Sequence, residues 1–249
     1  MSNDDFFIGS SDQHPQQDRR TFLRTGLTLT AGSALTGFGL AKLQAHAGNG
    51  GWDGATENEY RGLLVSTPYP MLITNDLGEN NKTALLGCQL KCGVALKIKS
   101  FADKQVVIKG SLIKHGDHAM IAVSESADWI REVSDAGPAP ALTQKTSLGR
   151  VSLNGEILDS KCWFGAMRPG HGKTHKSCAS LCIRGGIPPA LFVNGQNNKS
   201  ALMLLTENME SFSMSILPFV ADPVQITGEL YQHNGTLFLD SSSEQIIRV

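Results

Sequence analysis

The sequence predicts a mainly β protein built from two copies of one β-rich module, with short helices between some of the strands. Short apolar runs with strand-like alternation recur along residues 61–239. Turn signals separate several of these runs, and Asn194-Gly195 and Asn234-Gly235 are two of them. The segments 106–115 and 224–233 share Val, Ile, Gly, Leu and His at matching positions, which indicates an internal duplication.

The first module is expected at residues 60–133, after a Gly-rich, polar segment at 48–59 that is typical of a flexible leader. A helical turn or two is predicted at 83–92, which would place Cys88 and Cys92 on one face. A short amphipathic helix is predicted at 127–133. The predicted strands of this module are 61–65, 71–74, 94–98, 105–112 and 118–123.

A linker is expected at residues 134–147, because its Gly- and Pro-rich sequence has the composition of interdomain segments. The second module then spans residues 148–249. Its predicted helices are 174–182 and 208–217, and Pro218 would end the latter. Its predicted strands are 149–158, 190–193, 201–206, 224–230 and 236–239.

This order of elements, ending in a Val-x-Ile-x-Gly-x-Leu hairpin, resembles exported bacterial domains with an oligonucleotide/oligosaccharide-binding (OB-like) β-barrel. The likeness is greatest in the second module. Its pattern Gly-x-Ile-x-Asp-x-x-Cys, His-x-x-Cys-Ala-x-x-Cys and Gly-x-Pro is similar to secreted proteins of this architecture. The resemblance implies two small OB-like barrels, but a fold of this kind does not identify a function.

The charge of the chain argues against a nucleic-acid partner, although many OB-like barrels bind one. The 249 residues carry 22 basic and 23 acidic side chains, for a formal net charge of -1. Affinity for phosphate backbones requires a surplus of Lys and Arg that this chain lacks. A protein surface or a small ligand is therefore the expected partner of these barrels.

The N-terminal segment Asp18-Arg19-Arg20-Thr21-Phe22-Leu23-Arg24 resembles the bacterial twin-arginine export signal. A mildly apolar segment follows at 25–43, and Ala45-His46-Ala47 has the small-x-small pattern that signal peptidase recognises. Residues 1–47 are thus the predicted signal peptide, cleaved after Ala47. The resemblance implies that the twin-arginine translocase exports the folded protein to the periplasm, with the membrane contacted through the signal alone. An uncleaved anchor is the alternative.

The chemistry of the second module centres on Cys162, His175, Cys178 and Cys182. On a helix starting near Thr174, the last three would share one face at i, i+3 and i+7, and Cys162 would complete a metal site. Such donors favour copper(I), zinc or an iron-sulfur cluster. Secondary candidates are Cys88 and Cys92, which would add two thiolates across the module interface, and His171.

Two other interpretations of the cysteines stay open. An oxidising compartment would favour disulfides that staple the barrels, for instance between Cys162 and Cys178 or Cys182. A catalytic thiol is the third interpretation, but it lacks an evident Asp to orient a histidine, since Asp159 is expected on a strand surface. Met167 is either a thioether ligand or a core residue.

We therefore hypothesise an exported accessory or electron-transfer protein that holds a metal or redox centre and has an exported protein partner. Catalysis is not expected. A disulfide-stapled, non-catalytic binding subunit of an exported enzyme complex is the alternative hypothesis, and a thiol-dependent enzyme is the third.

Overall fold

The computed structural model describes residues 20–21, 23–28, 50–78, 82–134, 142–194 and 200–249. The chain divides into two units, Met1–His46 and Ala47–Val249, and each is described by itself. In the first unit, residues 23–28 are helical. Arg19 and the predicted cleavage site after Ala47 lie outside the described residues. Across the described ranges, no helix is long and apolar enough to cross a membrane.

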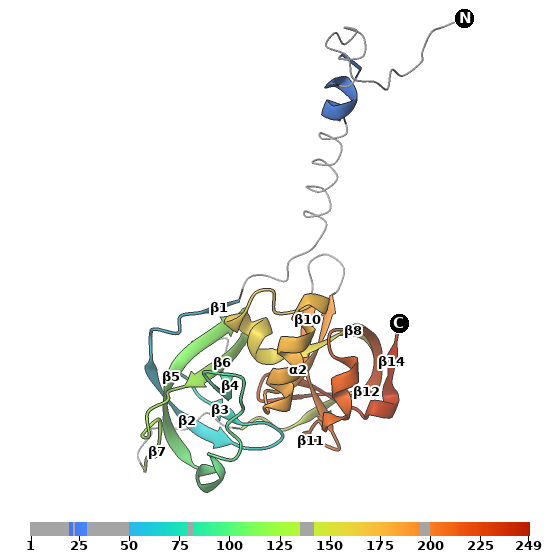
Figure 1. Cartoon of the computed structure of the whole chain (residues 1–249). Helices are drawn as coiled ribbons and strands as arrows, with labels where there is room; N and C mark the ends of the chain where they lie inside the picture. The colour runs from blue at the N-terminus through green and yellow to red at the C-terminus, as the bar shows by residue number, and fades with distance from the viewer. Residues whose placement is uncertain (1–19, 22, 29–49, 79–81, 135–141, 195–199) are drawn as a thin grey trace, which may run out of the picture. The chain divides into compact units, whose positions relative to one another are not determined.

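The first half of the second unit forms a closed five-stranded β-barrel (Figure 1). Its strands are paired in the order β2-β3-β4-β6-β5, and β5 closes back on β2, while β1 and β7 pair with β5 at its edges. The elements are β1 (Gly51–Trp52), β2 (Asn58–Val65), β3 (Met71–Ile73), β4 (Thr83–Cys88), η1 (Lys99–Phe101), β5 (Gln105–His115), β6 (His118–Val123) and β7 (Ile130–Glu132).

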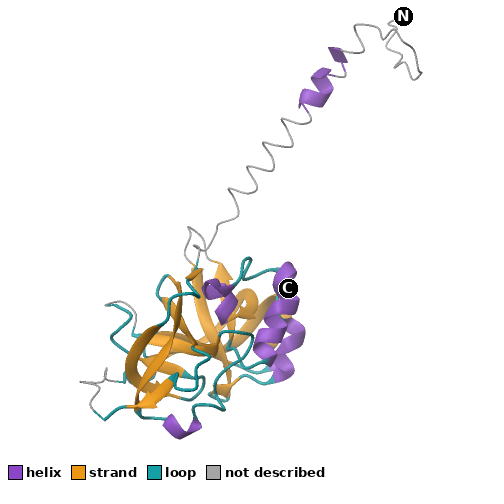
Figure 2. Ribbon diagram, turned by 60° about the vertical axis from the view of Figure 1, so that its left-hand side comes forward, coloured by secondary structure: helices purple, strands orange, loops and turns teal. Residues whose placement is uncertain are grey.

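The second half forms another closed five-stranded barrel, in the order β8-β9-β10-β13-β12, with β12 closing on β8. The helix α2 lies outside its strands (Figure 2). The elements are β8 (Thr146–Asp159), η2 (Cys162–Ala166), η3 (Lys173–His175), α2 (Lys176–Arg184), β9 (Pro189–Asn194), β10 (Ser200–Glu207), β11 (Glu210–Ser211), η5 (Met214–Phe219), β12 (Pro223–His233), β13 (Thr236–Asp240), η6 (Ser243–Gln245) and β14 (Ile246–Arg248).

The two barrels share one topology, so the predicted fold class of two OB-like modules is confirmed. In each barrel, counted in chain order, strands one, two and three are antiparallel neighbours, strand three runs parallel to strand five, and strand four closes on strand one. The shared glycine of the repeat has the same role in both copies. A Cβ on Gly110 would lie 2.5 Å from Ala122 O, and one on Gly228 would lie 2.3 Å from Asp240 O, so close strand approach excludes a side chain.

Four predictions in and before the first module differ from the structure. Residues 83–88 form the strand β4 instead of a helix, because all six side chains are buried between neighbouring strands, and such a fully buried run has no visible alternation. Residues 94–98 form a turn instead of a strand, and the side chains of Val94 and Ile98 are buried in the core of the first barrel. The predicted helix 127–133 contains the edge strand β7, and the predicted leader 48–59 contains β1 and the start of β2.

In the second module, the predicted helix 208–217 is replaced by β11 and the 3-10 helix η5, which includes Pro218. The helix bearing Cys178 and Cys182 starts later than predicted, with His175 at its N-cap and Thr174 in the preceding turn η3. The two Cys-x-x-x-Cys pairs are also not equivalent. Cys88 ends the third strand of its barrel and Cys92 follows it, whereas Cys178 and Cys182 lie between the first and second strands of theirs.

The barrels pack against each other through a shared apolar core. Each barrel also has a core of its own, and the third cluster of buried side chains combines residues of both, including Met71 and Ile113 from the first and Leu158 and Phe238 from the second. Tyr69 crosses this interface. Its hydroxyl donates to Leu205 O in β10 and accepts from the backbone N–H of Phe212 at 3.0 Å.

Replacing Tyr69 with Phe should lower the free energy of unfolding by about 1–3 kcal/mol, because a buried carbonyl and a buried N–H lose their partner. Urea denaturation of the variant measures this loss. The variant Tyr60→Phe is the control for losing a tyrosine hydroxyl away from this interface, since its ring packs in the core of the first barrel alone and its hydroxyl bonds the side chain of Asn58. Equal stability of Tyr69→Phe and the unmodified protein would contradict this role of the hydroxyl.

Candidate metal centre

The connection between β8 and β9 carries all three cysteines that are free in the described residues. This connection spans residues 160–188, whereas residues 66–70 suffice at the equivalent place in the first barrel. Near its start the connection forms the short helical segment η2, whose first residue is Cys162. Near its end it forms α2, which carries Cys178 and Cys182. The free thiols of the described residues therefore lie on the longer of the two equivalent connections.

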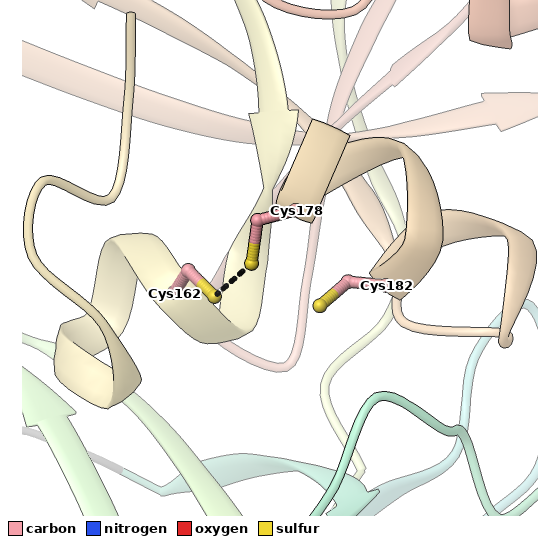
Figure 3. A group of neighbouring side chains, drawn as sticks. All are labelled: Cys162, Cys178 and Cys182. Atoms are coloured by element: carbon pink, nitrogen blue, oxygen red, sulfur yellow. Dashed lines mark hydrogen bonds between the residues drawn. The ribbon is translucent and has the colours of Figure 1, made fainter. Parts of the chain in front are cut away.

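The three thiols converge. Their Sγ atoms all lie within 4.8 Å of one another, and the Sγ atoms of Cys162 and Cys178 are 3.9 Å apart (Figure 3). Cys162 and Cys182 are buried at the barrel interface, and Cys178 is half-buried. The Sδ atom of Met167 lies 3.5 Å from Cys178 Sγ, on the exposed side. Three thiols therefore face one small volume, and a thioether lies beside one of them, Cys178.

Cys88 and Cys92 do not add thiolates to this group, because they form a disulfide with an S–S distance of 2.02 Å. The predicted four-thiolate site across the interface is therefore wrong. The disulfide instead closes a tight loop after β4, in which Cys88 N–H also donates to Cys92 O at 2.9 Å. The sequence prediction had placed these residues on a helix, where their side chains would have been free to bind.

Two lysines that the sequence analysis did not single out bring positive charge to the thiols. Lys91, inside the disulfide loop, donates from Nζ to Cys178 Sγ at 2.7 Å. Lys161 is buried, and its ammonium donates to the carbonyls of Cys88, Gln89 and Leu90 at 2.5, 2.9 and 2.6 Å. All three donors of this ammonium are used, which is what allows a charge to be buried here.

The thiols and lysines shift one another's pKa values. A hydrogen bond from the Cys162 thiol, together with the Lys91 charge, lowers the pKa of Cys182 against the opposing effect of burial. The same hydrogen bond and burial raise the pKa of Cys162. Burial lowers the pKa of Lys161, and the contact with Cys178 raises that of Lys91.

A second group of donors shares Cys162. Asp159 is fully buried at the end of β8, which corrects its expected place on a strand surface. Its Oδ1 accepts from Cys162 N–H at 2.8 Å, and its Oδ2 lies 3.0 Å from Nε2 of the buried His175. Donor atoms of Asp159, Cys162 and His175 lie within 4.8 Å of one another, so this group is a further potential metal site.

Of the predicted ligands, the structure brings Cys162, Cys178 and Cys182 into one group. It places His175 in the second group, paired with Asp159. His171 is exposed and its ring packs near Phe192. The aspartate could have been found from the sequence, because it precedes Cys162 by three residues, the spacing at which a side chain can accept from a backbone N–H.

A charged cluster around Asp222 holds the helix that carries two of the thiols. The Asp222 side chain is 9% exposed and accepts from Lys173, from Lys176 Nζ at 3.1 Å and from Arg248 Nε at 3.0 Å. The bonds from Lys173 and Arg248 hold the pKa of Asp222 well below its usual range. This carboxylate ties η3 and α2 to the last strand, β14.

Comparisons of the chain with protein-family models, with curated proteins and with solved structures find no match. The fold is therefore assigned from its strand order, and the site from its own geometry.

Replacing Asp222 with Asn should lower the free energy of unfolding by about 1–3 kcal/mol at pH 7, because three cations lose a charged acceptor. The difference should shrink at pH 3. A carboxylate with a lowered pKa stabilises above the ordinary pKa of aspartate, and this contribution is lost as the pH falls toward the lowered value. Urea denaturation at both pH values tests this, with the exposed Asp103→Asn as control. A difference independent of pH would count against it.

Proposed function

We propose that this protein binds one soft metal ion through Cys162, Cys178 and Cys182 and acts as an exported accessory that holds or passes on this ion. One observation carries the proposal: three thiols from two separate elements converge within 4.8 Å without forming a disulfide. Ligand sulfurs about 2.3 Å from a tetrahedral ion lie roughly 3.8 Å from each other. The 3.9 Å between Cys162 and Cys178 fits that spacing, whereas a disulfide bond is about 2.0 Å long.

The donor set favours copper(I) over zinc and over an iron-sulfur cluster. Thiolate and thioether sulfur are soft ligands that select copper(I), and Met167 adds a thioether beside Cys178. Zinc would need a fourth ligand or a water molecule to complete its usual tetrahedron. A cubane cluster commonly takes four thiolates, but Cys88 and Cys92 are already bonded to each other.

The two lysines support an anionic metal-thiolate complex. Three thiolates carry more negative charge than a single copper(I) ion neutralises, and leaving such charge uncompensated between two apolar barrel surfaces is costly. Lys91 contacts Cys178 directly, and Lys161 holds a second positive charge next to Cys162 in the chain. Because this charge is already in place, little rearrangement is needed when the ion binds.

Export is part of the proposal through the sequence. The paired arginines and the Ala45-His46-Ala47 segment support passage through the twin-arginine translocase, which carries folded proteins with a cofactor already loaded. A reduced thiol site that must survive in an oxidising compartment would benefit from being filled before export. The partner would be an exported protein that receives the metal or its electron.

Copper(I) titration under anaerobic conditions, in competition with a chromophoric copper(I) chelator, should give one tightly held ion per chain. Cys178→Ser should weaken binding about 100-fold or more, because it removes one of three ligands from the first coordination shell. The matched control is His171→Ala, whose exposed ring lies outside both donor groups. Equal affinity of Cys178→Ser and the unmodified protein, or no binding at all, would contradict the proposal.

A thiol-dependent enzyme is the second candidate, and the Asp159–His175 pair beside Cys162 favours it. This pair has the carboxylate-imidazole hydrogen bond that orients a base in many thiol enzymes. Cys162 is buried, however, and a nucleophile must be reached by its substrate. The disulfide-stapled binding subunit is supported by one observed disulfide, that between Cys88 and Cys92.

Denaturing the metal-free protein without reductant should expose three thiols per chain, because Cys88 and Cys92 stay bonded. Alkylation followed by mass spectrometry counts and locates them. A single thiol would favour the disulfide-stapled alternative. In the native protein, Cys178 should react first because it is the most accessible of the three, whereas first reaction at Cys162 would favour the enzyme.

A further inference from the structure

The disulfide loop of the first barrel lies against the thiol site of the second. Its lysine, Lys91, reaches Cys178 Sγ, and its backbone carbonyls from Cys88 to Leu90 accept from Lys161. The first barrel takes part in the site through this loop, and the two modules therefore complete it together.

The loop also packs closely on the C-terminal end of α2, the helix that carries Cys178 and Cys182. Gly93 N–H donates to Gly185 O at 2.8 Å. A Cβ on Gly185 would lie 1.9 Å from Lys91 O, and one on Gly93 would lie 2.5 Å from Gly186 O. Backbone meets backbone here with no room for side chains, so a displaced loop would release the contacts that cover this end of the helix.

The disulfide is what holds the loop in this shape. It joins residues four positions apart, so intact it leaves the backbone between Cys88 and Cys92 few conformations. Cys88 is buried, but Cys92 is half-buried and Lys91 and Leu90 between them are exposed, so a reductant would approach the bond from the Cys92 side. Accessible disulfides are the ones most open to thiol–disulfide exchange.

We propose that the Cys88–Cys92 loop is a redox-sensitive wall of the thiol site, which retains the bound ion while the disulfide is intact and speeds its release when the disulfide is reduced. This inference rests on the proposed metal-binding function. In the reductive step, a dithiol reductant gives two electrons and two protons to the disulfide and becomes a disulfide itself. Cys88 and Cys92 become thiols, and the loop is no longer closed.

The contacts explain why opening the loop would speed release. Lys91 would lose the position from which it donates to Cys178, the most accessible of the three thiols. Lys161 would lose the ordered carbonyls that fix its ammonium. Hydrogen bonds to charged groups contribute enough that losing the Lys91 contact alone corresponds to a rate increase of about tenfold.

The test compares the full chain with its disulfide intact and the variant Cys88→Ser/Cys92→Ser, which mimics the open loop without adding competing thiols. Both are loaded with one copper(I) ion, and transfer to excess bathocuproine disulfonate is followed by absorbance. We expect release to be about tenfold faster from the double variant. The exposed Lys97→Met, in the turn after the loop, is the matched control and should release at the unmodified rate.

A second readout keeps this inference separate from the proposed function. In the metal-free proteins, N-ethylmaleimide should label Cys178 faster in the double variant than in Lys97→Met, because the open loop no longer holds Lys91 against Cys178. If the double variant does not fold, brief dithiol reduction of the unmodified protein, followed by gel filtration, supplies the open loop. Equal labelling in the open and closed states would overturn the inference.

The outcomes distinguish the two proposals. No copper binding by the unmodified protein defeats the proposed function, and labelling then decides the role of the loop. Binding of one ion, with the same release rate from the open and closed states, defeats the redox-sensitive wall and leaves the metal site in place. Faster release together with faster labelling supports both.

Discussion

The apolar packing of one barrel against the other is the constraint on which the rest of this structure depends. The shared core buries Cys162 and Cys182 together with Trp163 and Phe164, so the thiols sit where water is scarce. Every polar group that reaches this depth needs a partner, because an unpaired donor or charge there costs several kcal/mol. The backbone carbonyls of residues 88–90 are the partners of the Lys161 ammonium, and the carboxylate of Asp159 is the partner of the His175 ring.

Because the barrels pack together, residues of both modules line the thiol site. The second barrel provides the three thiols on its enlarged β8–β9 connection, and the first provides the loop whose Lys91 contacts Cys178. Without the first barrel, the thiols would keep Lys161 nearby but would lose the contact from Lys91. A duplicated fold can acquire a site in this way, by changing one loop in each copy while the strands and their shared glycines stay the same.

The sequence predicted the duplication and the cysteine group, because both are visible as local patterns. The matching segments 106–115 and 224–233 became β5 and β12, each the fourth strand of its barrel. The strand β4 was mistaken for a helix because it is buried on both faces. The three-residue spacing of Asp159 to Cys162 is visible in the sequence, but its full burial is not. Lys161 was missed for a different reason: its role comes from the Cys88–Leu90 carbonyls, which are distant in the chain, and no spacing rule encodes them.

The central claim is that three protein thiolates bind one soft ion at the interface between the barrels. X-ray absorption at the copper edge tests this most directly, because it reports the element, number and distance of the first-shell ligands. The account predicts a copper(I) spectrum with about three sulfur atoms near 2.3 Å, reduced to about two in Cys178→Ser. A first shell dominated by nitrogen or oxygen, or one unchanged by that substitution, would contradict it.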